Sequence, residues 1–223
     1  MERYEPIEWT NTIFENQGQA DKKRILVFGD SIMRDGVRNE LKKLLGDSVY
    51  VDLYATSRSY ESEFFDKEVD FFLNLCKYDT IFITIGGHDM EMCADVFYKK
   101  YEELYLKVKS MHKDARILLG TFTPIIENNS SNIYKDSNST VIKRNECARK
   151  LAEKYSLTLV DNYSVVDGKY ELKVPDGVHF KEEGYKLMAE NLKKYLSEYW
   201  FLFCMVELKY GGIYVNTTMV WEL

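Results

Sequence analysis

A serine stands directly after an apolar run near the start of the chain, in the stretch RILVFGDSIMRDG at residues 24–36. A buried strand that stops at a glycine and presents Ser31 at the start of a helix is one way to expose a nucleophile. A serine hydroxyl is a poor nucleophile until a base removes its proton, and a carboxylate usually orients that base. The same pattern also fits an ordinary strand-to-helix turn, so the question becomes whether the chain offers a base.

One of the three histidines stands where such a base would be needed. His179 lies in PDGVHF, residues 175–180, before the last helical pattern, and Asp176 precedes it by three residues. Taken alone, Asp-x-x-His is a weak signal, because Asp is common in turns before helices. His112, in KSMHKDAR, is better explained as a residue near the end of a helix. Together with a serine exposed after the first strand, the His179 and Asp176 pair favours a Ser–His–Asp arrangement.

Short apolar runs rich in β-branched residues alternate with segments of helical periodicity. This order predicts right-handed βαβ crossovers and an α/β fold whose mostly parallel, five-stranded sheet is covered on both faces. We expect strands at 24–29, 49–55, 79–85, 116–121 and 157–161, and helices at 32–45, 61–77, 94–112, 139–155 and 181–198.

Ligands of such sheets bind beyond the C-terminal ends of the strands. The residues that directly follow the predicted strands are therefore candidates for function, and they lie at 29–31, 56–60, 86–89 and 122–124. The segment 122–139 is rich in Asn and Ser, which predicts a surface loop that can line a pocket.

Gly-Asp-Ser-Ile after the first strand and Asp-Gly-Val-His-Phe before the final helix resemble the SGNH hydrolase superfamily, also called the GDSL esterase/lipase family. The likeness covers roughly residues 24–197. It implies a three-layer α/β/α, flavodoxin-like sandwich. It also implies that Ser31 is the nucleophile, His179 the general base and Asp176 the acid that orients it. No metal or organic cofactor would be needed.

The family takes its oxyanion donors from the N–H of the nucleophile, from a glycine after the second strand and from an Asn after the third. This chain departs at the last two positions. Ser59 stands at the glycine position and still supplies a backbone N–H. His88 stands at the Asn position, and its imidazole can donate one N–H. We expect Ser31, Ser59 and His88 to form the oxyanion hole, in what looks like a subgroup with histidine in the third block.

Neighbours of these residues are candidates for substrate contacts or for support. We expect Asp30 to accept backbone N–H groups at the helix start and Asp89 to fix the third loop. Arg34 is either a solvated helix residue or a partner of Asp35, Asp30 or a substrate oxygen. The other candidates of this kind are Arg58, Gly87, Thr123 and Pro124.

Charge and composition narrow the range of partners. A net charge of −6 gives no electrostatic reason to bind nucleic acid or an anionic membrane. The four cysteines form no CxxC or Cys/His cluster, so neither a zinc site nor a disulfide framework is predicted. The chain has no apolar leader and no apolar run long enough to span a bilayer, which favours a cytoplasmic location.

The predicted organisation is an N-terminal arm at 1–23, a hydrolase-like domain at 24–199 and a tail at 200–223. The tail alternates apolar and polar residues like a hairpin around Gly211 and Gly212, and it is a candidate surface for pairing with a second copy.

The expected activity is hydrolysis of a short-chain ester, such as an acetyl ester, of a small or carbohydrate substrate. Tyr60, Tyr134 and the Asn-rich loop would suit a polar, sugar-bearing ester. Three alternatives stay open: an acyltransferase, a lysophospholipase or thioesterase on the same fold, and a catalytically weak α/β binding domain.

Overall fold

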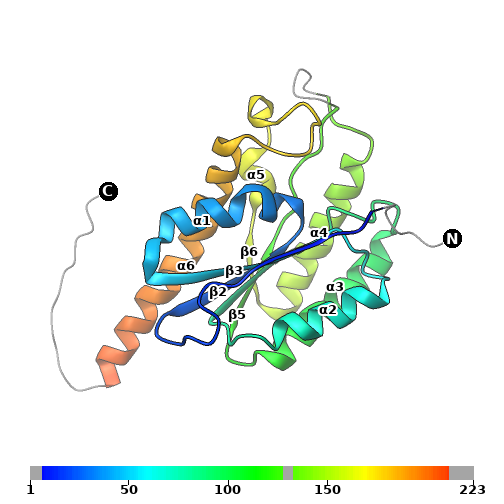
Figure 1. Ribbon diagram of the computed structural model, residues 1–223. Coiled ribbons are helices and arrows are strands. Elements are labelled where there is room, and N and C mark those ends of the chain that lie inside the picture. The colour runs from blue at the N-terminus through cyan, green and yellow to red at the C-terminus, as the bar shows by residue number, and fades with distance from the viewer. Residues whose placement is uncertain (1–6, 128–132, 211–223) are drawn as a thin grey trace.

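The computed structural model describes residues 7–127 and 133–210, in which helices cover both faces of a six-stranded sheet (Figure 1). The strand order is β1-β3-β2-β4-β5-β6, and every neighbouring pair is parallel except β1 with β3. The predicted α/β class with a mostly parallel sheet is confirmed. The strands are β1 Thr10–Ile13, β2 Lys23–Gly29, β3 Val49–Thr56, β4 Thr80–Thr84, β5 Arg116–Gly120 and β6 Thr158–Val160.

The sheet has one strand more than the five predicted. The arm supplies it: β1 pairs antiparallel with β3, with Thr10 opposite Thr56 and Ile13 opposite Leu53. Both central residues of this edge strand are exposed, so its sequence, Thr-Asn-Thr-Ile, needs no apolar run and contains none. Its strand conformation comes from pairing with the free edge of β3 and not from the local pattern.

The helices occupy two layers. Helices α1, α5 and α6 lie on one face of the sheet, and α2, α3 and α4 on the other (Figure 1). Helix α5 is too short to have shown a periodicity in the sequence. The helical elements are η1 Met33–Val37, a π-helical turn, α1 Arg38–Leu45, η2 Gly46–Ser48, α2 Glu63–Leu73, α3 Ala94–Met111, α4 Asn138–Tyr155, α5 Asn162–Val166, η3 Tyr170–Leu172 and α6 Glu182–Tyr210.

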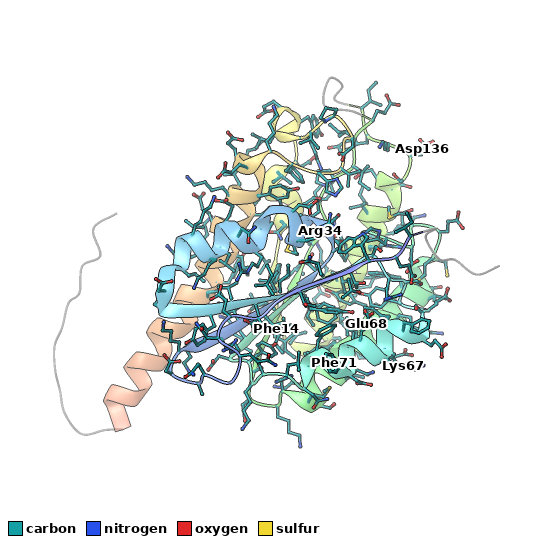
Figure 2. The ribbon with its side chains drawn as sticks, in the orientation of Figure 1. Phe14, Arg34, Lys67, Glu68, Phe71 and Asp136 are labelled. Carbon is teal, nitrogen blue, oxygen red and sulfur yellow. The ribbon has the colours of Figure 1, made fainter. Side chains whose placement is uncertain are left out.

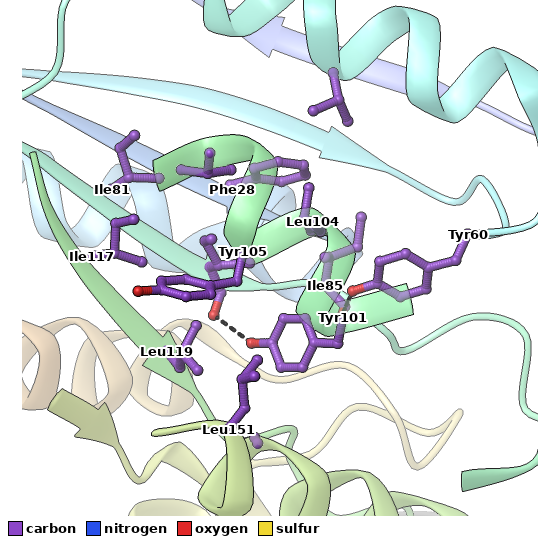
Figure 3. Packing of buried hydrophobic residues seen from close by; sticks show 14 of the residues in the cluster. Phe28, Tyr60, Ile81, Ile85, Tyr101, Leu104, Tyr105, Ile117, Leu119 and Leu151 are labelled. Atoms are coloured by element: carbon purple, nitrogen blue, oxygen red, sulfur yellow. Dashed lines mark hydrogen bonds between the residues drawn. The ribbon is translucent and has the colours of Figure 1, made fainter. Parts of the chain in front are cut away.

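An aromatic-rich core fills the face beneath α2, α3 and α4 (Figure 3). Two buried tyrosines donate their hydroxyls to strand-end carbonyls: Tyr60 to Ile85 at 2.7 Å and Tyr101 to Ile83 at 3.2 Å. The interpretation of Tyr60 as a substrate contact is therefore wrong, because its ring is packed among core side chains such as Phe97.

The last helix is longer than predicted. Helix α6 continues to Tyr210, so the predicted boundary at 199 falls inside one helix and the residues before Gly211 form no hairpin strand. Gly211, Gly212 and the rest of the tail lie outside the described residues. Among those described, no helix is both long and apolar enough to cross a membrane.

A buried ion pair joins the arm to the centre of the sheet. Arg24 of β2 contacts Asp52 of β3 at 2.8 Å, with both side chains almost completely buried. The same guanidinium donates to the carbonyls of Glu15 and Asn16, and Asp52 also accepts the N–H of Glu15 at 2.9 Å. The pair therefore fixes the path of the chain between β1 and β2.

We expect Asp52→Ala to lower the free energy of unfolding by about 3–5 kcal/mol, because it leaves the Arg24 guanidinium buried without a counter-ion. The double variant Arg24→Met/Asp52→Leu should lose less, because it removes both charges. Urea unfolding followed by circular dichroism measures both. A loss below about 1 kcal/mol for Asp52→Ala, the value of an exposed pair, would contradict the structural role.

Candidate active site

Ser31 stands at the first turn after β2, at the C-terminal edge of the sheet. The carbonyl of Asp30 accepts the N–H groups of Met33 and Arg34, both at 3.1 Å, so the chain turns into η1 immediately after the strand. This edge lies between β2 and β4, where the strand order changes direction along the chain. In open α/β sheets such a switch point is where ligands bind.

The structure brings Ser31, His179 and Asp176 together. Ser31 Oγ lies 2.8 Å from His179 Nε2, and His179 Nδ1 lies 2.7 Å from Asp176 Oδ2. Such a chain can pass the hydroxyl proton to the imidazole while the carboxylate stabilises the resulting imidazolium. Residues 148 positions apart in the sequence thus form one hydrogen-bonded unit.

A tight turn presents His179. Asp176 Oδ1 accepts the N–H groups of Val178 and His179 at 2.7 and 2.9 Å. Burial acts to raise the pKa of Asp176, but hydrogen bonds from His179 and the two N–H groups outweigh it and lower the pKa below its ordinary value. Gly177 has φ +73°, and a Cβ there would lie 2.1 Å from the Ile126 carbonyl oxygen, so this turn requires glycine.

Asp30 ties the Ser31 turn to the loop after β4. Its buried carboxylate accepts the N–H of Ile32 at 3.1 Å and the N–H of Gly87 at 3.0 Å. Burial raises the pKa of Asp30. A Cβ on Gly87 would lie 2.5 Å from Asp30 Oδ2, so glycine is needed for this approach. The N–H of Gly87 is thus engaged by Asp30 and serves the structure of the loop.

His88 lines the cavity beside Ser31 and is held there by an arginine that the sequence analysis missed. Arg144 of α4 is almost fully buried and donates to three backbone carbonyls of the loop, those of Gly86, His88 and Asp89, with 2.5 Å to His88. An arginine within an amphipathic helical pattern usually indicates a solvated position, so the sequence carried no signal for this role.

Arg58 and Ser59 lie in the loop that follows β3. Ser59 is buried and its Oγ accepts the N–H of Glu61 at 3.0 Å, but Ser59 is not among the described residues that line the cavity. Arg58, also outside that lining, forms ion pairs with Glu8 and with Glu68, the latter at 3.0 Å. The ion pairs thus engage the Arg58 guanidinium within the protein, and Ser59 as an oxyanion donor stays a prediction.

Asp89 connects this second loop to the third. Its Oδ2 accepts the N–H of Tyr60 at 3.1 Å, and its φ of 56° lies in the left-handed region. Burial raises the pKa of Asp89. The side chain supports loop geometry and lies outside the residues that line the cavity in the described part of the chain.

The arm contacts Arg34 and His88 through Trp9. Arg34 contacts Asp35 at 2.5 Å, and its guanidinium lies 4.0 Å from the ring centroid of Trp9, where the arm passes the start of the first helix (Figure 2). Trp9 meets the ring of His88 edge-on at 6.0 Å, and Asp35 Oδ2 lies 3.7 Å from His179 Nε2. The arm carried no motif, so Trp9 had no signal in the sequence.

A cavity of about 110 Å³ adjoins Ser31 and His179. Apolar side chains from the loop after β5 and from α4 form much of its wall, namely Phe122, Ile125 and Val141, and Thr123 adds a hydroxyl. This volume holds a few water molecules or a short acyl group. Within residues 7–127 and 133–210, no three His, Cys, Asp or Glu side chains gather as a metal site would require.

Two further buried side chains fix the cavity wall. Asn145, next to Arg144 on α4, accepts the N–H of Phe122 at 2.7 Å and donates to its carbonyl at 3.0 Å. Lys173 is fully buried and donates to the carbonyls of Pro124 at 2.6 Å and Val178 at 2.7 Å. Pro124 thus acts through its backbone, as the point where the loop after β5 is joined to the His179 loop.

The chain matches the model of the GDSL-like lipase/acylhydrolase family over residues 27–187, and it belongs to this family. A search of curated proteins found no match.

Solved structures share the fold at low sequence identity. A GDSL-like lipase from Bacteroides thetaiotaomicron is 19% identical with a TM-score of 0.64, covering 82% of this chain and 92% of its own. An acetyl xylan esterase is 18% identical with a TM-score of 0.61, covering 77% and 98%. A carbohydrate acetylesterase family member from Sinorhizobium meliloti is 19% identical with a TM-score of 0.61, covering 78% and 97%.

Burial lowers the pKa of Lys173 to about 7. The unfolded chain, in which the lysine keeps its ordinary pKa of 10.5, therefore binds a proton that the native state releases above pH 7. We expect the stability of the parent relative to Lys173→Met to rise by about 2–3 kcal/mol between pH 7 and 9. Urea unfolding at both pH values measures this change. The exposed Lys181→Met controls for the lost charge, and an equal change for both variants would contradict the expectation.

Proposed function

We propose that this protein is a serine carboxylic ester hydrolase that releases a short acyl group, such as acetyl, from a small or carbohydrate alcohol. The observation that carries the proposal is the unbroken hydrogen-bonded chain from Ser31 Oγ through His179 to Asp176, beside a small cavity. Membership of the acylhydrolase family supports the reaction class. Fold neighbours named as an acetyl xylan esterase and a carbohydrate acetylesterase family member support the substrate class.

The reaction proceeds through a covalent acyl-enzyme. His179 Nε2 takes the proton of Ser31 as Oγ forms a bond to the ester carbonyl carbon. The tetrahedral intermediate collapses when the bond to the alkoxide breaks and His179 returns its proton to the leaving oxygen. A water molecule, deprotonated by His179, then attacks the acyl-enzyme and releases the acid, which restores the Ser31 hydroxyl. Asp176 stays ionised and stabilises the imidazolium.

The negative oxygen of the intermediate requires hydrogen-bond donors. We assign this role to the backbone N–H of Ser31 and to the imidazole of His88, which line the cavity together. The backbone N–H of Ser59 is the third predicted donor, on a loop that the Ser59 hydroxyl stabilises by accepting the N–H of Glu61. Arg144 acts on the same oxygen indirectly, because it fixes the backbone on both sides of His88.

The size of the cavity and the residues around it favour a short acid and a hydroxyl-rich alcohol. A cavity of about 110 Å³ favours a short acyl group over the chain of a long fatty acid, which disfavours the lysophospholipase alternative. Near His179 and His88, Trp9, Arg34 and Asp35 offer an aromatic ring with a donor and an acceptor beside it. Aromatic rings and charged groups of this kind suit the faces and hydroxyls of a sugar.

Ser31→Ala and His179→Ala should each reduce the hydrolysis of p-nitrophenyl acetate by at least about 10³-fold, because each removes the nucleophile or its base. Thermal unfolding curves should show that both variants are folded at the assay temperature. A fluorophosphonate probe should label the parent enzyme but not Ser31→Ala. Ser48→Ala, at an exposed serine after α1, is the matched control. Activity equal to that of the parent in either variant would refute the assignment.

His88→Asn should keep the turnover within about tenfold of the parent or improve it, because the amide also donates an N–H to the developing oxyanion. His88→Ala should lose about 10²–10³-fold in kcat. Steady-state kinetics on p-nitrophenyl acetate compares the two variants. If His88→Asn falls as far as His88→Ala, the imidazole has a role other than donation.

A further inference from the structure

Asn162 is a polar residue of the cavity wall whose hydrogen-bonding capacity is only partly used. It stands at the start of α5, directly beyond β6, and is completely buried. Its Oδ1 accepts a hydrogen bond from Nδ2 of Asn191, on α6, at 3.4 Å. The amide oxygen of Asn162 therefore faces α6. Its amide nitrogen, Nδ2, has no hydrogen-bond partner in the described part of the protein.

The unused donor is on a residue that lines the cavity. In the described residues, the buried side-chain atoms without a partner are Nδ2 of Asn162 and three others, on Glu8, Tyr78 and Arg144. Of these residues, Asn162 alone lines the cavity. The neighbouring wall residue Thr121 is satisfied within the protein, because its hydroxyl donates to Asp161 at 2.8 Å and accepts the N–H of Tyr163 at 2.9 Å.

A buried donor without an acceptor costs free energy, and a ligand that brings an acceptor recovers it. A site built to hydrogen-bond its substrate also discriminates strongly against an analogue that lacks the bonding atom. We propose that Asn162 determines acyl specificity and selects short acyl groups that carry an acceptor oxygen, such as an alkoxy, hydroxy or oxo substituent. This inference rests on the proposed esterase function.

The other side chains of the wall limit what the rest of the acyl group can be. Phe122, Ile125 and Val141 present apolar surface to it. Carbon atoms of the acyl chain pack against these three residues, while the oxygen substituent accepts from Asn162. The predicted acid is therefore a short chain with one acceptor oxygen and not a polyol or a second carboxylate.

Two pairs of p-nitrophenyl esters of equal length test this specificity. Methoxyacetate is compared with butyrate, and 3-methoxypropionate with pentanoate, so that an ether oxygen replaces one methylene at two different depths. The ether oxygen accepts a hydrogen bond and cannot donate one, so each pair reports on a hydrogen-bond donor in the wall, and the variants distinguish the Asn162 amide from the Thr123 hydroxyl. For each enzyme the ratio of kcat/KM within a pair is divided by the ratio of the hydroxide-catalysed rates. Any general loss of activity cancels in this ratio.

In the parent enzyme the corrected ratio should favour the ether in at least one pair. In Asn162→Leu that ratio should fall by roughly tenfold or more. Thr123→Val, which removes the hydroxyl of another wall residue, is the matched control and should leave the ratio unchanged. If Asn162→Leu does not fold, Asn162→Asp keeps the shape, replaces the NH₂ by oxygen and should show the same fall.

The inference is overturned if the ratio changes by less than about twofold in both pairs, or if Thr123→Val lowers it as much as Asn162→Leu does. Those results leave the proposed function intact, because the esters are still hydrolysed by a Ser31-dependent reaction. If no ester is hydrolysed, or if hydrolysis persists in Ser31→Ala, the proposed function fails instead.

Discussion

The carboxylate of Asp30 joins the turn that carries Ser31 to the loop that carries His88, and the geometry of the candidate site depends on this connection. A carboxyl group buried so completely is tolerated only where hydrogen bonds replace water, and here the N–H groups of Ile32 and Gly87 do so. The proposed nucleophile and the proposed oxyanion donor are thus fixed relative to each other by one buried side chain.

Other buried side chains around the cavity also fix loops, but they do so by donating hydrogen bonds to backbone carbonyls. Loops at the end of a parallel sheet lack the repeating hydrogen bonds of strands and helices, so their carbonyls need partners from elsewhere. Arg144 serves the loop after β4, Asn145 serves Phe122, and Lys173 joins Pro124 to Val178. The planar guanidinium of Arg144 suits this task because it reaches three carbonyls at once.

The sequence predicted the parts of the fold that come from periodic patterns. The five parallel strands and the long helices agree with the structure to within a few residues, apart from the extension of α6. Strand β1 and helix α5 were missed because segments of four and five residues show no periodicity, and tertiary pairing decides their conformation.

At the site, the proximity of Ser31 to His179 followed from two short motifs and from the rule that strand ends converge. The ion pairs of Arg58 with Glu8 and Glu68, and the contact of Asp89 with the N–H of Tyr60, did not follow, because they join segments that meet only in the fold. Arg144, Lys173 and Asn162 had no signal either. Each is a polar residue type that is usually solvated, and only the packed structure reveals its burial.

The antiparallel strand from the arm also changes what the molecule presents to other molecules. Without β1, the eight fully buried residues of β3 would border the sheet and offer their backbone as a template for a strand from another chain. With β1 in place, one border is a four-residue polar strand and the other is the three-residue β6. Short borders of this kind discourage edge-to-edge aggregation, so the arm protects the colloidal stability of the protein as well as contributing Trp9 to the site.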